Sequence, residues 1–256
     1  MNILVANDDG IYAEGIKALA YKLTEIGDVT VVAPKHHQSG KGHAVSFEKE
    51  IEIEKYNFGN NIEAFSVDGT PRDCVYFALN GLCNKKFDLV VTGINQGSNI
   101  STDCVSSGTC GSACVGFLYG IPSISFSLDF GTCYNFTEAA ITACDVVKWY
   151  INAKLPTNFA INCNIPNIPI DEIKGWKVVV HGSLHLYHKN LVFKRMDEKI
   201  IADVTNLTTE TVSMNNSLKY DEYALHNGYV TLQPVNIDLT DYNALDIVEA
   251  SLQTQV

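Results

Sequence analysis

The sequence predicts an α/β protein with a doubly wound, mostly parallel sheet and a C-terminal extension rich in β-hairpins. Three observations predict this fold. Short apolar runs alternate with segments of helical periodicity over roughly the first 165 residues, as in βαβ units. A capping signal, Thr70-Pro71, opens one of the helical segments. From Gly175 onward, β-branched and aromatic runs replace the alternation, which is typical of hairpins.

The elements of the core follow one another in strand-helix order. The predicted strands are apolar runs bounded by polar or turn residues, and they cover residues 2–6, 28–33, 88–92, 121–128 and 158–162. The predicted helices cover residues 15–26, 70–82, a Gly-rich segment before residue 121, and 136–151. Irregular strands are expected over 43–67. Right-handed crossovers between successive strands make such a sheet parallel and Rossmann-like.

The chain is expected to divide into a core, residues 1–170, that carries the active site and an extension, residues 171–256. The extension contains the runs WKVVV, NLVFK and GYVTLQP and a short helical stretch near residues 220–226. Its late segments are expected to return to the core. Because little sequence is left to cover its apolar hairpins, we expect a homodimer or homotetramer.

Charge and hydropathy restrict the partners. The 256 residues carry a formal net charge of -11, which disfavours a nucleic-acid polymer as the main partner. The longest apolar stretch, residues 115–128, is interrupted by two glycines and a proline, and the chain begins directly with strand-like sequence. These features predict a cytoplasmic protein with no membrane partner.

Several familiar site signatures are absent from the sequence. The eight cysteines lie mostly inside apolar periodic segments and form no C-x-x-C pair, so they are predicted to be buried thiols rather than disulfides or zinc ligands. No H-E-x-x-H helix, Walker A loop or G-x-S-x-G elbow occurs. An acidic pair also begins response-regulator receivers, but no convincing phosphoacceptor aspartate follows the third strand.

Two adjacent carboxylates follow the first predicted strand. Asp8 and Asp9 stand at its carboxyl end, where open α/β sheets bind ligands. Two such groups repel each other unless a cation lies between them. Magnesium and manganese prefer oxygen ligands and keep open positions that a phosphate oxygen can fill. The alternative is that Asp-Asp-Gly forms an ordinary turn.

Three further polar loops are predicted at the same edge of the sheet. They cover residues 36–40, 93–99 and 106–111, and the last one precedes an apolar helix. Hydroxyls and free backbone N–H groups at a helix N-terminus can hold a phosphate. Ser and Thr also serve as ordinary N-caps, so this loop alone is ambiguous. The convergence of four polar loops favours a site.

The motifs together resemble the SurE survival-protein nucleotidase family. The matching segments follow in family order over nearly the whole chain, and they are ILVANDDGIYAEGI, VVAPKHHQSGKG, VDGTPRDCV, DLVVTGINQGSN, SSGTCGSA, GIPSISFSL, INCNIPN and GYVTLQPVNIDLTD. The resemblance implies a metal-dependent phosphomonoesterase that hydrolyses nucleoside 5'- and 3'-monophosphates. It also implies that C-terminal elements are exchanged between subunits.

The resemblance also implies residue roles. One divalent cation per subunit, magnesium or manganese, would be bound by Asp8, Asp9, Ser39 and Asn95. Asp8, Asp9 and Asn95 would be the catalytic residues. The substrate phosphate would face Asn99, Ser107, Gly108 and Thr109.

The chemistry expected of such a site is in-line attack by a water on the phosphoryl group. Asp8 or Asp9 is a candidate to accept the proton of that water. His36, His37 and His43, in or near the second loop, are alternative donors to the leaving alkoxide. Two other readings stay open: a metal-dependent nucleotide-binding sensor without turnover, and a structural protein whose polar loops coincide by chance.

Overall fold

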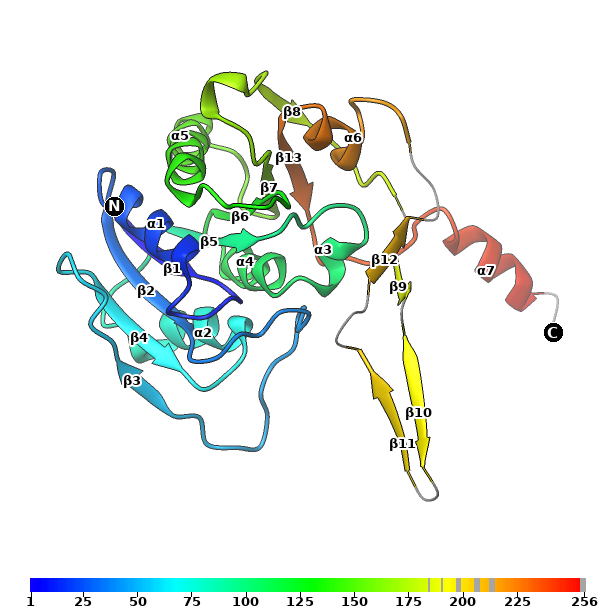
Figure 1. The fold of residues 1–256 in the computed structure, drawn as a ribbon, viewed down its shortest axis with the longest axis horizontal. Helices are drawn as coiled ribbons and strands as arrows, with labels where there is room; N and C mark the ends of the chain where they lie inside the picture. Colours follow the sequence, from blue (N-terminus) through cyan, green and yellow to red (C-terminus); the bar gives the residue numbers. More distant parts are fainter. Residues whose placement is uncertain (184, 190, 197–198, 205–207, 212–214, 254–256) are drawn as a thin grey trace.

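A computed structural model describes residues 1–183, 185–189, 191–196, 199–204, 208–211 and 215–253 (Figure 1). Within these ranges the main sheet has nine strands in the order β3-β4-β2-β1-β5-β6-β7-β13-β8. Their bounds are Asn2–Ala6 for β1, Asp28–Pro34 for β2, Ile53–Lys55 for β3, Glu63–Val67 for β4, Leu89–Gln96 for β5, Ser123–Leu128 for β6, Ala160–Ile165 for β7, Trp176–Val178 for β8 and Val230–Val235 for β13. The pairs from β4 to β7 are parallel.

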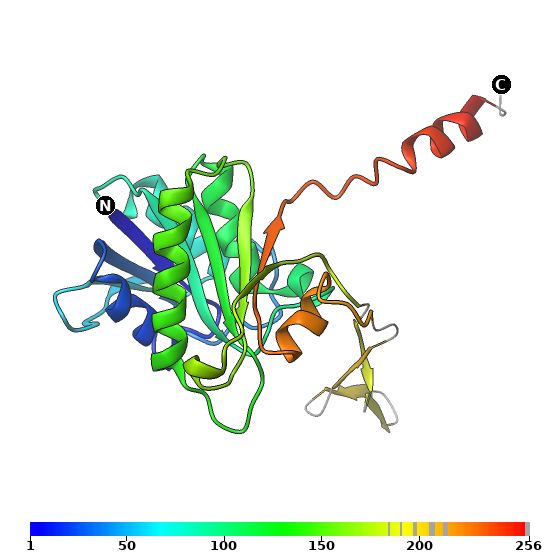
Figure 2. The same ribbon diagram turned by 90° about the horizontal axis from the view of Figure 1, so that it is seen from above.

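Helices cover both faces of this sheet, as Figure 2 shows for the long α5. The helices are α1 (Glu14–Leu23), α2 (Pro71–Phe77), α3 (Asp103–Ser106), α4 (Gly108–Leu118), α5 (Phe136–Ala153), α6 (Asp221–His226) and α7 (Leu245–Gln253). One apolar cluster joins α1 and α5 to the sheet, and a second joins α2 and α4 to its other face. The predicted doubly wound α/β fold is therefore confirmed.

Strand β5 differs from its predicted bounds in a way that matters for the site. It was expected to end at Thr92, but it continues to Gln96 and pairs with β6 again after an irregularity. Gly93 makes this possible, because its φ is 119° and a Cβ there would come within 2.2 Å of the Phe126 carbonyl oxygen. Residues expected in a loop are thus held by the sheet.

Other boundaries also needed correction. The helix expected over 70–82 ends at Phe77 and continues as a wider π-type turn over Ala78–Leu82. Within 43–67, β4 is a regular parallel strand beside β2 rather than an irregular insertion. Helix α7 was not predicted at all. In the predicted run NLVFK, Asn190 lies outside the described residues.

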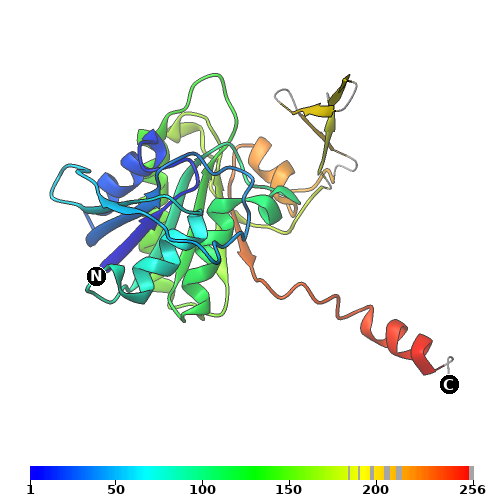
Figure 3. The same cartoon turned by 90° about the horizontal axis from the view of Figure 1, so that it is seen from below.

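The C-terminal part combines strands of the main sheet with projecting elements. β13 pairs antiparallel with β7 and parallel with β8. Two antiparallel strand pairs lie beyond the sheet: β9 (His185–Lys189) pairs with β12 (Thr208–Thr211), and β10 (Val192–Met196) forms a hairpin with β11 (Lys199–Asp203). Figures 2 and 3 show α7 at the end of an extended segment that leads away from the body. In the described ranges, no helix is long and apolar enough to cross a bilayer.

Candidate metal and phosphate site

The predicted site residues gather at the carboxyl edge of the parallel strands. A cleft of about 670 Å³ lies there between the ends of β1, β2 and β5 and the start of α4. Its lining comes mainly from the four polar loops, with one residue after β6 and one from the C-terminal extension. The lining residues are Asp8, Ser39, Gly40, Asn95, Gln96, Ser98, Asn99, Asp103, Ser106, Ser107, Phe130 and Val204. An adjoining cavity of about 450 Å³ includes Asp9, His37 and again Ser39. The convergence expected from the strand ends is thus present in the fold.

Asp8 is almost fully buried beneath the cleft. Only 2% of it is exposed, and its Oδ1 accepts a hydrogen bond from the Thr109 hydroxyl on α4. Burial raises the pKa of Asp8, and the hydrogen bond from Thr109 opposes that rise. The Asp8 carbonyl also accepts from the Gln38 amide at 2.7 Å, which links the loops after β1 and β2.

Asp9 lies beside Asp8 and faces the adjoining cavity. Its Oδ2 accepts a hydrogen bond from the Gln96 amide at 3.1 Å. Burial, followed by the negative charge of Asp8, raises the pKa of Asp9 to about 6. His37 Nδ1 lies 3.5 Å from Asp9 Oδ1, but 63% of the His37 side chain is exposed. An exposed histidine only weakly offsets two carboxylate charges.

The two carboxylates are candidates to bind a cation. Neither Asp8 nor Asp9 has a Lys or Arg partner among the ion pairs of the described residues. In the same ranges, no group of three or more His, Cys, Asp or Glu side chains is placed to bind a metal. Two carboxylates completed by neutral oxygen ligands and waters suit magnesium or manganese better than zinc.

Ser39 and Asn95 could supply the neutral oxygens. Ser39 lines both the cleft that includes Asp8 and the adjoining cavity that includes Asp9. The Asn95 amide Nδ2 donates to the Gly97 carbonyl at 2.8 Å. That bond orients the side chain and leaves its Oδ1 as the atom for a cation. The four predicted ligands fit a hard divalent ion.

The predicted phosphate run lies at the N-terminus of α4. Ser107 caps this helix by accepting from the Cys110 amide at 3.1 Å. A Cβ on Gly108 would come within 2.8 Å of Asp8 Cβ and 2.9 Å of Pro71 Cγ, so only glycine lets the helix start approach Asp8. The helix therefore directs its free N–H groups and its dipole toward the carboxylate pair, where an anion and a cation could meet.

Asn99 is held by a polar network that sequence reasoning missed. Its Nδ2 donates to Ser127 Oγ at 2.8 Å, and its amide donates to Asn164 Oδ1 at 2.7 Å. Its carbonyl accepts from the side chains of Asn162 and Asn164. A signal was present, because SISFSL and INCNI place polar residues at every second position, which turns them all to one face.

Asp221, on α6 in the C-terminal part, was also missed. Its carboxylate accepts from the amide of Ser101 at 2.6 Å and from the amide of Gly182 at 2.9 Å. The bond from Ser101 ties the C-terminal part to the loop that leads from Asn99 into α3, and the bond from Gly182 lies within the C-terminal part. No local motif announces this role, because the partners are 120 and 39 residues away along the chain.

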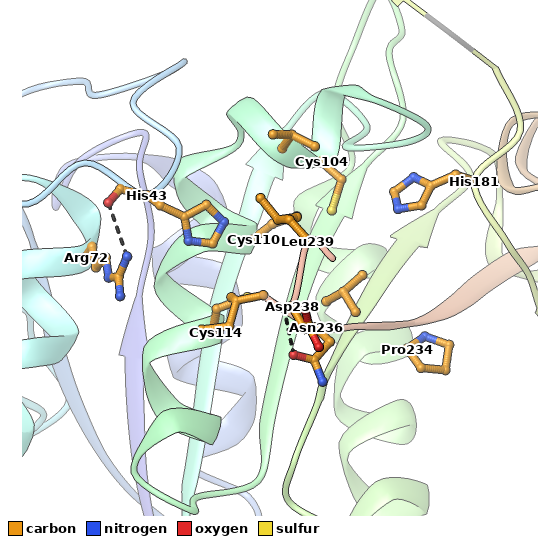
Figure 4. Close-up of a pocket in the computed structure, with 13 residues that line it drawn as sticks. His43, Arg72, Cys104, Cys110, Cys114, His181, Pro234, Asn236, Asp238 and Leu239 are labelled. Carbon is orange, nitrogen blue, oxygen red and sulfur yellow. Dashed lines mark hydrogen bonds between the residues drawn. The ribbon is translucent and has the colours of Figure 1, made fainter. Parts of the chain in front are cut away.

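A third cavity borders α4 (Figure 4). It measures about 470 Å³, and Cys104, Cys110, Cys114 and His43 are among its lining residues. Burial raises the pKa of Cys114 to about 12, so this thiol stays protonated near neutral pH. His43 faces this cavity and lines neither of the carboxylate cavities, whereas His37 contacts Asp9.

The cysteines behave as predicted. All eight lie in the described part of the chain as free thiols, and all except Cys133 are buried. Buried thiols of this kind pack as small apolar side chains.

Fold and site together define a class: a doubly wound α/β protein with an acidic pair and a helix N-terminus at the carboxyl edge of its sheet. A family model described as "Survival protein SurE" matches residues 3–188. The chain therefore belongs to the SurE family, which confirms the resemblance inferred from its motifs.

Individual relatives agree over the full length. A "5'-nucleotidase SurE" of Mannheimia succiniciproducens is 36% identical over 100% of both chains. Another of that name from Clostridium botulinum is 37% identical over 97% of this chain and 98% of its own. The crystal structure of the SurE protein from Aquifex aeolicus matches with a TM-score of 0.81 and 33% identity, covering 98% of this chain and 99% of that one.

Proposed function

We propose that this protein is a metal-dependent phosphomonoesterase that hydrolyses nucleoside 5'-monophosphates, and 3'-monophosphates as well, to nucleoside and phosphate. The observation that carries the proposal is the acidic pair at the end of β1, in which Asp8 is buried against the N-terminus of α4 and Asp9 lines the adjoining cavity. The name 5'-nucleotidase, which the relatives share, supports the same activity.

Binding would place the substrate phosphate between the two halves of the site. The amides at the start of α4 and the Ser107 and Thr109 region would face its oxygens, with Asn99 beside them. Asp8, Asp9, Ser39 and Asn95 would hold one magnesium or manganese ion per subunit. When bound, that ion would polarise the phosphoryl group and lower the pKa of an attacking water.

The protein's own groups would then move the protons. Asp8 or Asp9 could accept the proton of the attacking water, because both carboxylates would lie beside the water that the proposed cation orients. Of the three histidines considered as the acid, His37 is favoured, because its Nδ1 lies 3.5 Å from Asp9. His43 is disfavoured because it faces the third cavity.

The two parts of the chain would have different tasks. Residues 1–170 would carry the catalytic groups, and 171–256 would serve mainly in assembly of a cytoplasmic homodimer or homotetramer. Support comes from apolar side chains left exposed, such as Phe193 (55%) in the hairpin and Ile247 (71%) in α7. Burying them against a second copy would remove this apolar surface from water.

The decisive experiment measures free phosphate released from a panel of nucleoside monophosphates with magnesium, with manganese and with a chelator. We expect turnover that depends on the metal. The net charge of -11 also predicts that mononucleotides are cleaved faster than long single strands. Metal and nucleotide binding without phosphate release would instead indicate a sensor, and metal-independent release would refute the assigned site.

A further inference from the structure

Phe130 is an aromatic side chain exposed at the rim of the cleft. It is 69% exposed, and it lines the same cavity as Asp8 and Asn95. A hydrocarbon ring can neither bind a hard cation nor transfer a proton, so the proposed hydrolysis does not use it. A single exposed apolar residue is common on protein surfaces. What requires explanation here is that its position is fixed.

Two interactions fix the ring. A Cβ on Gly97 would come within 2.6 Å of Phe130 Cε1, so the ring packs directly on the backbone of Gly97. The Phe130 amide donates to Asp129 Oδ1 at 2.9 Å, and that oxygen also accepts from Ser98 Oγ at 2.9 Å. The Gly97 amide in turn donates to the Leu128 carbonyl at 2.9 Å. The loops after β5 and β6 therefore hold the ring in place.

A fixed ring of this kind suits a flat partner. The exposed surface of the ring borders a cavity whose other walls are suited to a cation and a phosphate. The part of a ligand beyond its phosphate therefore extends past the ring. Aromatic side chains bind nucleobases by stacking, and every base presents a flat π surface. Preorganisation of the ring reduces the entropy lost on binding.

We propose that Phe130 is a specificity-determining residue on which the base of the substrate stacks. This inference rests on the proposed phosphatase function and deepens it. The site prefers phosphomonoesters that carry an aromatic base over base-free sugar phosphates. It discriminates weakly between bases, because stacking requires only their shared π surface.

The test compares adenosine 5'-monophosphate with ribose 5-phosphate, in magnesium and in manganese. In Phe130→Ala, the ratio of kcat/KM for the nucleotide to kcat/KM for the sugar phosphate falls about tenfold, mainly through KM. Phe130→Trp keeps the wild-type ratio. Phe47→Ala is the matched control, because Phe47 is 79% exposed and lines neither the cleft nor the adjoining cavity. An unchanged ratio in Phe130→Ala overturns the proposal.

A binding measurement separates this inference from the proposed activity. The fluorescence of the indole in Phe130→Trp should change on adding adenosine 5'-monophosphate, by comparison with wild type, and far less on adding ribose 5-phosphate. A fluorescence change specific to adenosine 5'-monophosphate, without phosphate release, would contradict the proposed phosphatase activity and support base stacking on Phe130. Phosphate release from nucleotides, together with equal fluorescence changes for both ligands, would contradict base stacking on Phe130 alone. Wild-type dimers that Phe130→Ala converts to monomers, with no change in the ratio, would assign the ring to subunit contact instead.

Discussion

The cleft and the C-terminal extension differ in how many of their side chains find partners within one chain. At the cleft, the described residues of a single chain bring the acidic pair, neutral oxygens and a helix N-terminus together. In the extension, hairpin and helix side chains such as Ile200 (60% exposed) and Leu252 (61%) point into solvent. The difference teaches that the polar groups of the cleft find partners within one chain, whereas the extension leaves apolar surface that the proposed assembly would cover.

The largest expected effect follows from changing the acidic pair. Asp8→Asn or Asp9→Asn removes one ligand charge with little change in shape, so kcat should fall by roughly a thousandfold, equivalent to about 4 kcal/mol of barrier. Metal-free folding should survive or improve, because mutual repulsion is relieved. Phosphate-release kinetics and thermal melts in chelator measure both. Near-full metal-dependent activity in both variants would mean that the pair is only a turn.

The next effect concerns the contact between α4 and Asp8. In Gly108→Ala, the added methyl meets Asp8 Cβ at 2.8 Å, so the helix start or the carboxylate must shift. We expect kcat to fall by about ten- to a hundredfold with a stability loss of about 1–3 kcal/mol. Leu118→Ala, at the exposed end of the same helix, is the control for kinetics and denaturant melts. Unchanged kcat in Gly108→Ala would show that the close contact between α4 and Asp8 does not matter for activity.

Asn95 gives a graded comparison within the cleft. Asn95→Ala removes a neutral ligand, so the metal concentration for half-maximal activity should rise by about tenfold, less than for either aspartate variant. Asn95→Asp restores an oxygen and should recover metal affinity. Phosphate release measured over a range of metal concentrations gives the order of metal affinities among these variants. A larger loss at Asn95 than at Asp8 would mean that the roles are misassigned.

The acidic pair also predicts a dependence of stability on pH. Since the pKa of Asp9 rises from 3.8 unfolded to about 6 folded, the metal-free protein loses stability as pH increases through about 6. The loss should be about 1–3 kcal/mol, roughly 2–10 °C in melting temperature. The metal-bound protein should not show this loss of stability. Asp9→Asn should reduce this dependence in melts with chelator without removing it, because burial also raises the pKa of Asp8. An unchanged dependence in Asp9→Asn would assign the loss of stability to other groups.

The smallest effect on activity is expected from α7. Val248→Asp with Leu252→Asp places charges on residues that are 58% and 61% exposed. The assembly should dissociate toward the 28.1 kDa chain, while activity per chain changes by less than about threefold. Sedimentation and phosphate release test this, with Glu249→Gln as control. Activity lost together with assembly would show that the cleft is incomplete in one chain.

Much of the site could be predicted because its residues directly follow apolar strands. The run NILVA identifies a buried strand, and a parallel sheet then brings Asp8 and Asn95 to one edge. The mistaken end of β5 had a physical cause: Gly-rich sequence is typical of loops, but Gly93 here allows close approach to β6. Helix α7 was missed although Leu245, Val248 and Leu252 repeat with helical spacing, because a nine-residue segment gives only a short periodic signal.

By itself, the sequence determined the α/β fold, the family and the polar strand ends, because these depend on local periodicity and on motifs of adjacent residues. Tertiary structure decided the rest. The hydrogen bond that opposes the raised pKa of Asp8 comes from Thr109, 101 residues away, and the hydrogen bond from the Ser101 amide to Asp221 spans 120 residues. The ring of Phe130 is fixed only because two separate loops meet at Gly97. Such contacts join distant segments whose approach is set by packing of the whole sheet, and no local pattern encodes it.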